Sequence, residues 1–159
     1  MKPLAITLRY LSGQTSISAG MELLAGWWKQ LGVDVKLKGQ DPNAFTQALF
    51  GGDDWDAAAL SVALPYPNQF MLYASGPAAP QGQNFAAIEN ADYAKLAQQA
   101  LGTPGKAGCD LWAQAEEALF RDVDVVPVAA DVVTTYSKTA RLAIGMNGTE
   151  PTSIRMLAH

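Results

Sequence analysis

Hydrophobic and polar positions in the first part of the chain repeat with the period of a strand, then of a helix, then of a strand again. Apolar and polar side chains alternate over 4–10 and 33–37, which predicts two strands that each bury one face. Between them, an apolar stripe at alternating spacings of four and three predicts a helix. Ser16 or Ser18 is a suitable N-cap for this helix, and Gly32 is the residue expected just past its end. The stripe consists of Ile17, Met21, Leu24, Trp28 and Leu31, with Trp27 either at its border or facing a partner.

The next stretch predicts a second helix and a third strand. Asp41 and Pro42 suit the N-cap and first residue of a short amphipathic helix that ends before Gly51. The run 55–62 is almost wholly apolar, so we expect a strand near the centre of the sheet that is covered on both faces. Strands and helices thus alternate, and right-handed crossovers would make much of the sheet parallel.

From 63 to 90 the chain has no clear period and contains several prolines and glycines. A loop of this length is uncommon in a compact domain and is often functional. One helix is predicted over 91–101 and another from after Gly105 to about Asp122, followed by extended segments at 125–128 and 132–136. The residues expected to face inward on the two helices are Tyr93, Leu96, Ala97, Ala100, Leu111, Trp112, Ala115, Leu119 and Phe120.

Composition limits the class of protein. With 159 residues the chain has the size of one domain, and 49% hydrophobic against 16% charged residues is enough for a buried core. The formal net charge of -4 argues against nucleic-acid binding, which needs clustered Lys and Arg. No apolar run approaches the roughly 20 residues that span a bilayer, and the sequence after Met1 lacks the pattern of a secretion signal, so we expect neither in this chain.

Residue types suited to catalysis are scarce. Cys109 is the only cysteine, which excludes an internal disulfide and a cysteine-based zinc site, and we expect an inert thiol that is at least half-buried. His159 is the only histidine and the last residue, a poor position for a catalytic base. Asp53, Asp54 and Asp56 form a carboxylate cluster, but carboxylates between a helix and a strand are more often solvated turn residues than metal ligands. We therefore expect no enzyme activity, no metal and no cofactor.

Aromatic and amide side chains gather in and beside the long loop. Without ionisable partners, such groups suit ligand binding better than bond making. Packing of the loop against the domain is the alternative role for each of them. The residues concerned are Tyr66, Phe70, Tyr73, Asn84 and Phe85.

A series of short motifs follows in order along the chain. The segments are LLAGWWKQLGVDVKL (23–37), FTQALFGGDDWDAAAL (45–60), PYPNQF (65–70), QNF (83–85), TPGK (103–106) with LWAQAE (111–116), and VVPV (125–128). In this order and spacing, the series resembles the family 5 solute-binding proteins, the oligopeptide and dipeptide receptors of ABC importers. The resemblance covers nearly the whole chain.

The resemblance implies a fold, partners and a location. The chain would be a single α/β domain over 1–159, a lobe of the periplasmic-binding-protein type II kind with a mixed sheet flanked by helices. Members of the family are longer and have two lobes joined by a hinge, so this chain would be the C-terminal lobe, without the N-terminal one. A peptide or other organic solute would bind between the lobes and pass to an ABC permease. The whole protein would be bacterial and extracytoplasmic, held at the membrane as a lipoprotein by an anchor outside this chain.

The resemblance and the strand order point to the same candidate site. Open α/β sheets bind ligands at the carboxyl ends of their strands, here the turn after Tyr10 and the loop after Val62. Closure of two lobes around a ligand requires no catalytic group. The candidate ligand-binding residues are Ser12, Gly13, Ser61, Ala63, Leu64, Tyr66, Asn68 and Asn84.

One departure from the family pattern concerns the ligand. Peptide receptors of the family usually carry a carboxylate just before the position of Phe70 that pairs with the peptide's α-amino group, and Ala63 and Tyr66 stand at the two acidic positions. The turn after Tyr10 also lacks a basic residue for a peptide carboxylate, since Arg9 lies on the strand. A sugar, glycolipid, siderophore-like or other organic solute therefore remains open beside a peptide. The alternative function is a non-transporting regulator or envelope scaffold on the same fold.

Overall fold

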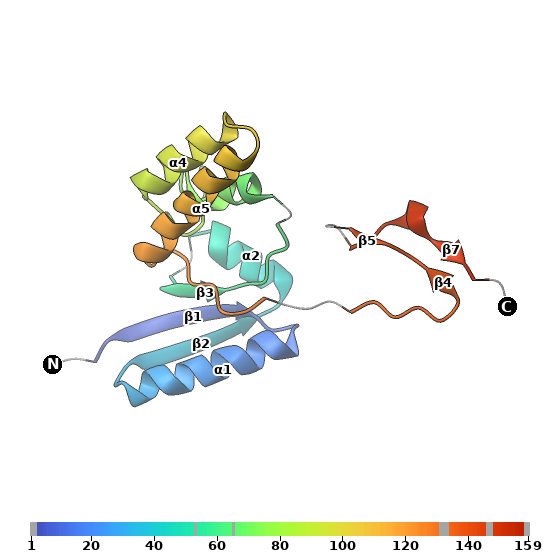
Figure 1. Ribbon diagram of the computed structural model, residues 1–159. Helices are drawn as coiled ribbons and strands as arrows, with labels where there is room; N and C mark the ends of the chain where they lie inside the picture. Colours follow the sequence, from blue (N-terminus) through green and yellow to red (C-terminus); the bar gives the residue numbers. More distant parts are fainter. Residues whose placement is uncertain (1–2, 53, 65, 131–133, 146–147, 158–159) are drawn as a thin grey trace.

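A three-stranded parallel sheet forms the first half of the molecule. The computed structural model describes residues 3–52, 54–64, 66–130, 134–145 and 148–157. Strands β1 (Ala5–Leu11), β2 (Asp34–Gln40) and β3 (Ala57–Ala59) lie in the order β2-β1-β3, and both pairings are parallel (Figure 1). The predicted alternation of strands and helices and the parallel direction of the sheet are therefore confirmed.

The third strand is shorter than the apolar run 55–62 and lies at the edge of the sheet, not at its centre. Among the described strands it pairs with β1 alone, from Leu8↔Ala57 to Tyr10↔Ala59, so it is an edge strand and the predicted central position was wrong. Its alanines have little surface to bury, and the larger apolar side chains come after it, where the chain has left the sheet. Leu60 and Val62 are accordingly 39% and 51% exposed.

Helix α1 (Thr15–Gln30) covers one face of the sheet and buries the predicted stripe in part. Leu8, Met21, Ala25 and Val35 form the buried core between helix and sheet, and Ile17, Leu24 and Trp28 pack against it. Leu31 is 80% exposed, contrary to the prediction, because the helix ends at Gln30 and Leu31 is its C-cap.

The ends of α1 differ in how well the sequence predicts them. Gly32 follows the helix with φ +85, in the left-handed region that favours glycine, as expected. The N-cap is Gln14, and its side chain makes no capping hydrogen bond, so the prediction of Ser16 or Ser18 was wrong. The Ser18 hydroxyl donates instead to the carbonyl oxygen of Ser12 at 3.4 Å.

Helix α2 (Pro42–Phe50) lies on the opposite side of the sheet from α1 (Figure 1). The Asp41 carboxylate accepts hydrogen bonds from the backbone N–H groups of Asn43 and Ala44 at 3.0 and 3.1 Å, so Asp41 is the N-cap that the sequence predicts. The helix buries the aromatic ring and aliphatic side chains of its inner face, which are Phe45, Ala48 and Leu49.

A helical cluster forms the second half of the molecule. It consists of the short helices η1 (Pro67–Phe70) and α3 (Met71–Ala74) and the longer α4 (Ala91–Leu101) and α5 (Lys106–Arg121). The predicted helix 91–101 is confirmed, and its N-cap Asn90 accepts a hydrogen bond from the Tyr93 N–H at 2.9 Å. The Asn90 amide also donates to Ala118 O, Asp122 Oδ2 and Asp124 Oδ2, which ties the start of α4 to the end of α5. Ala74, Tyr93, Ala97, Ala115, Ala118 and Leu119 form the buried core of this cluster.

Two predictions on α5 differ from the structure. Phe120, predicted to face inward, is 45% exposed, since the buried face of the helix end is occupied by Ala118 and Leu119. Cys109 is exposed and so is not the half-buried thiol that was expected, because it lies in the first turn of α5 and is not one of the buried residues of that helix.

The long loop connects the two halves through one aromatic ring. Phe85 contacts Phe50 at the end of α2, with ring centroids 5.5 Å apart and an edge-to-face geometry. Its centroid also lies 6.4 Å from that of Trp55, just before β3, and 5.9 Å from that of Tyr73 on α3. Phe85 therefore packs against elements of both the sheet and the helical cluster.

The final part of the chain leaves the body of the molecule and extends away from it (Figure 1). Its described strands are pairs of two residues each: β4 (Ala140–Arg141) with β7 (Arg155–Met156), and β5 (Ile144–Gly145) with β6 (Gly148–Thr149), with η2 (Pro151–Ser153) between them. The predicted segment 125–128 forms no regular strand pairing in the part that the structure describes. Of the other predicted segment, Val132 and Val133 lie outside that part, and 134–136 are not in a strand. No helix among the described residues has both the length and the apolar character needed to cross a membrane.

Candidate functional site

The carboxyl ends of the three strands meet at one edge of the sheet, as the parallel pairing requires. Leu11 pairs with Gln40 at the end of β2, and Tyr10 pairs with Ala59 at the end of β3. We call this region the carboxyl edge and define it as the turn 12–14, the first turn of α1 and the segment 60–64. The predicted candidates Ser12, Gly13, Ser61, Ala63 and Leu64 all lie in it.

Hydrogen bonds hold the turn after β1 in place. The Ser12 N–H and hydroxyl both donate to the carbonyl oxygen of Gln40, at 2.9 and 3.0 Å. The Ser12 carbonyl oxygen accepts from the Ser18 hydroxyl. The turn is thus fixed to the end of β2 and to α1, while Ser12 and Gly13 stay exposed.

The N-terminus of α1 opens onto this edge. In the described structure no side chain caps it, and its first turn carries no acidic residue. Backbone N–H groups at a helix start that lack intrahelical partners can donate to a ligand, and the helix dipole makes this end partly positive. The first turn adds exposed hydroxyl groups from Thr15 and Ser16.

The segment after β3 supplies exposed apolar and polar groups. Ser61, Ala63 and Asn68 are exposed, and Leu64 is half-buried. Tyr66 is 56% exposed and offers a ring face and a hydroxyl. These residues combine hydrogen-bonding groups with apolar surface, the mixture that small-molecule sites use.

Asn84 differs from the other candidates because its side chain is 1% exposed. Its amide nitrogen donates to the carbonyl oxygens of Gly76 and Ile88 at 3.2 and 2.9 Å, and its Oδ1 accepts from the Ile88 N–H at 2.9 Å. The side chain thus holds the long loop together, and we assign Asn84 to the loop rather than to a ligand site.

A side-chain hydrogen bond between Arg9 and Gln40 joins β1 to β2 close to the carboxyl edge, and no sequence pattern predicts this pair. Arg9 is 4% exposed; its guanidinium donates to Gln40 Oε1 at 2.9 Å and to the carbonyl oxygen of Asp54 at 3.2 Å. The Gln40 amide in turn donates to the carbonyl oxygen of Ala44 in α2 at 3.3 Å. Arg9 alternates with the core residue Leu8, so strand periodicity places it on the α2 side of the sheet.

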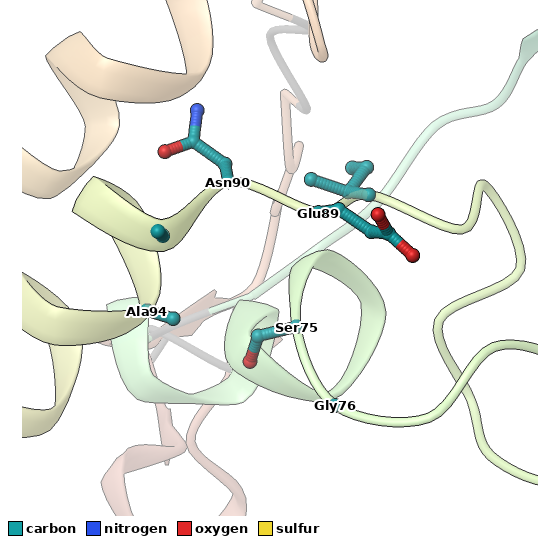
Figure 2. A pocket seen from close by; sticks show the side chains of 7 residues that line it. Ser75, Gly76, Glu89, Asn90 and Ala94 are labelled. Carbon is teal, nitrogen blue, oxygen red and sulfur yellow. The ribbon is translucent and has the colours of Figure 1, made fainter.

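Two hollows in the described surface lie away from the carboxyl edge. One, of about 280 Å³, lies between the end of α3 and the start of α4, with Ser75 and Ala94 on two sides of it (Figure 2). The Ser75 hydroxyl there donates to Met71 O at 2.8 Å. Its lining is Ser75, Gly76, Ile88, Glu89, Asn90, Ala91 and Ala94.

The other hollow, of about 340 Å³, lies at the opposite end of the strands, near Thr7 and Asp34. Asp56 in its wall accepts a hydrogen bond from the Thr7 N–H at 2.7 Å, so this carboxylate fixes the start of β3. No group of three potential metal ligands occurs among the described residues, a set that leaves out Asp53 and His159. Asp56 thus has a structural role at the start of β3, through its hydrogen bond to the Thr7 N–H.

Solved structures with the same fold are solute-binding proteins. The Escherichia coli murein tripeptide binding protein matches with a TM-score of 0.63 and 26% sequence identity over 77% of this chain. The oligopeptide-binding protein AppA of Bacillus subtilis, in complex with a nonapeptide, gives 0.60 and 20% over 74% of this chain. NikA of Staphylococcus aureus, in complex with Ni(L-His)2, gives 0.59 and 18% over 76%.

These matches confirm the resemblance to the family 5 solute-binding proteins and the α/β fold of the periplasmic-binding-protein type II kind. The chain spans 24%, 23% and 25% of the three matched chains, about a quarter of their length. No protein-family model matches the sequence, and no curated protein sequence matches it.

Proposed function

We propose that this chain is the C-terminal lobe of a solute-binding protein that delivers a peptide or other organic solute to an ABC importer. The observation that carries the proposal is the carboxyl edge: the ends of β1 and β3 come together beside an uncapped helix start, on the fold of known solute-binding proteins. Ligands of open parallel sheets bind at such an edge. The ligand lies between this edge and a second lobe.

Exposed apolar surface is evidence that a second lobe covers part of this chain in the whole protein. The described parts of the segment 134–157 extend away from the body (Figure 1), and large apolar side chains there and just before it are open to solvent: Tyr136 is 90%, Met156 73% and Val128 74% exposed. Apolar side chains gathered on an extended segment mark a surface that another part of a protein covers. This segment therefore packs against the N-terminal lobe in the whole protein.

The chemistry of the edge supports binding without catalysis. Its side chains are hydroxyl, amide and aliphatic groups, and Tyr66 just beyond it adds an aromatic ring. These groups can hold a ligand but lack an acid-base pair to react with it. A solute-binding protein of this kind works outside the cytoplasm, held at the membrane by a lipid anchor or free in the periplasm.

A binding measurement with the 159-residue chain tests the proposal. Calorimetric or NMR titration with short peptides and saccharides should give saturable, weak binding, because half of the contacts of a two-lobed site are missing. The variant Ser61→Trp fills the edge and should abolish this binding, whereas Ala113→Trp, on an exposed position of α5, should leave it unchanged. The absence of any saturable ligand, or equal binding by Ser61→Trp, would contradict the proposal.

A non-transporting regulator or scaffold is the second candidate function. It is favoured by the outer face of α1, where Leu23 and Trp27 are 55% and 54% exposed one helical turn apart. A scaffold would depend on this face and not on the edge. Its partner binding would be lost in Trp27→Ala and retained in Ser61→Trp.

A further inference from the structure

The outer face of α1 carries apolar side chains that no other element of the described structure covers. We propose that this face is a pairing surface for a second copy of the chain, with the two α1 helices antiparallel and related by two-fold symmetry. The pairing surface consists of Ser16, Gly20, Leu23, Trp27 and Leu31. The proposal goes beyond the proposed function and does not depend on it, because the pairing uses no ligand.

The pairing surface is a second apolar face of α1, separate from the one in the core. At 3.6 residues per turn, its five positions lie within an arc of about 80° around the helix axis. Leu23, Trp27 and Leu31 are 55%, 54% and 80% exposed there, whereas Met21 and Ala25 are buried against the sheet. Figure 1 shows α1 at the margin of the molecule, with the sheet on one side and no element of the described structure on the other.

Gly20 has no explanation within the fold. It lies in the interior of α1, about 20° from Trp27 around the helix axis, although glycine makes a helix less stable than alanine does. Its backbone is not in the left-handed region, and an added Cβ would have nothing within 4 Å. A glycine on an exposed apolar face leaves a depression that lets another helix approach closely.

The pairing surface is complementary to itself. Gly20 and Trp27 are seven residues apart, which is about two helical turns. Pairing two copies antiparallel, about an axis near Leu23, places each Trp27 against Gly20 of the other copy. Both depressions are then filled at once, as in an isologous interface, so one surface supplies both halves of the contact.

Charge favours a second copy over a lipid surface. No charged residue lies in the arc of the pairing surface, since Glu22 and Lys29 are about 140° and 160° from Trp27 around the helix axis. Two copies can therefore meet there without like charges at the contact. A helix that binds a lipid surface is instead rich in Lys and Arg on its polar face, but Lys29 is the only basic residue of α1 and the net charge of the chain is -4.

The available area sets the strength of the pairing. Leu4 adds to the face near the end of α1, because its carbonyl oxygen accepts from the Asp34 N–H at 2.7 Å and its side chain is 66% exposed. With Leu23, Trp27 and Leu31 it offers roughly 300 Å² of apolar surface per copy, taking about 100 Å² for a fully exposed leucine and about 200 Å² for a tryptophan. A standard interface buries about 800 Å² per partner, of which more than half is apolar. We therefore expect a weak, reversible dimer that forms at high protein concentration.

Sedimentation velocity of the 159-residue chain, from about 10 µM to about 1 mM, tests the pairing. The average mass should rise with concentration from 16.9 kDa toward twice that value. Trp27→Ala should weaken the association about ten-fold. A chain that stays monomeric at 1 mM overturns the proposal and leaves the face to a different partner.

Two glycine variants separate pairing from folding. Gly20→Gln and Gly26→Gln each replace a glycine of α1 that has nothing within 4 Å of an added Cβ, and each raises helix propensity. Gly26 lies about 100° from Trp27 around the helix axis, outside the pairing surface. Gly20→Gln should weaken the association about ten-fold without loss of stability to urea, whereas Gly26→Gln should change it less than two-fold. Weakening of less than three-fold by Gly20→Gln or Trp27→Ala, or equal weakening by the two glycine variants, overturns the proposal.

Disulfide cross-linking tests the antiparallel orientation. The exposed Cys109 is first removed by Cys109→Ser. In that background, Leu23→Cys lies near the two-fold axis and should give a disulfide-linked dimer on mild oxidation. Ser16→Cys should not, because antiparallel pairing places this position roughly 20 Å from its copy, too far for a disulfide. Equal cross-linking of both variants contradicts the antiparallel arrangement.

Discussion

The buried hydroxyl of Tyr93 gives the sharpest test of the helical cluster. Tyr93 is 2% exposed in the core of α4 and α5, and its hydroxyl oxygen has no hydrogen-bond partner among the described residues. An unsatisfied buried polar group costs about 1–3 kcal/mol. Tyr93→Phe removes the group and keeps the ring, so we expect the free energy of unfolding at pH 7 to rise by about 1 kcal/mol, after the loss of packing by the hydroxyl.

The same burial makes the effect depend on pH. Burial and, to a smaller extent, the nearby Glu116 carboxylate together raise the pKa of Tyr93 from 10.0 to about 12. As the pH rises, the Tyr93 hydroxyl loses its proton in the unfolded chain before it does so in the native protein. The contribution of the protonated form to the free energy of unfolding is therefore fully present below pH 10 and is lost as the pH rises toward and through 12. At 1.36 kcal/mol per pKa unit, the native protein loses about 1 kcal/mol by pH 11 and about 2 kcal/mol by pH 12 from this group alone.

Urea unfolding followed by far-UV circular dichroism at pH 7, 9, 10, 11 and 12 measures both effects. Tyr93→Phe should be more stable at pH 7, and its advantage should grow between pH 10 and 12. Tyr136→Phe is the matched control, because Tyr136 is 90% exposed and its removal should change neither quantity. A Tyr93→Phe variant that is less stable at pH 7 by 1 kcal/mol or more would refute the inference that the hydroxyl is unsatisfied. Parallel stability-against-pH profiles of Tyr93→Phe and the unchanged protein would refute the raised pKa.

Three further changes test local features by urea unfolding. Val123→Gly should stabilise the protein by about 0.5–1 kcal/mol, because Val123 has φ +59, which costs an L-residue about 1–2 kcal/mol and glycine less; no gain would mean that this backbone carries no strain. Gly108→Ala should destabilise it by about 1–3 kcal/mol, since an added Cβ would clash with the Thr103 carbonyl oxygen, whereas Ala107→Gly at the exposed neighbour should cost at most about 1 kcal/mol. A stabilised Gly108→Ala variant would show that the turn adapts. Asn90→Ala should cost about 2 kcal/mol, because the cap on α4 and the hydrogen bonds to α5 are lost together, and a cost below about 0.5 kcal/mol would contradict that double role.

Local patterns predicted the helices well because their signals are local. Asp41 is the predicted N-cap of α2 in the structure, and Gly32 has the expected left-handed backbone. The pattern failed where long-range pairing decides: the length and edge position of β3 depend on which strand is its neighbour, and no period in the sequence encodes that. The prediction that Leu31 is buried was wrong because the apolar stripe continues for one residue past the end of α1.

The candidate site shows the same division. Parallel strand order was enough to bring Ser12 and Ser61 to one edge, because the ends of parallel strands share a side of the sheet. The roles of Asn84 and of the Arg9–Gln40 pair depend on side-chain hydrogen bonds between distant segments. Residue type alone does not distinguish a buried asparagine from an exposed one.

The position of Phe85 has a consequence for how the chain denatures. Its ring touches Phe50 and Trp55 from one half and Tyr73 from the other, and the loop that carries it is held by the buried Asn84. Each half has its own small apolar interior, so a single cooperative transition requires that loss of one interior also weakens the other. The ring contacts of Phe85, in a segment without regular secondary structure, are therefore among the contacts that couple the unfolding of the two halves.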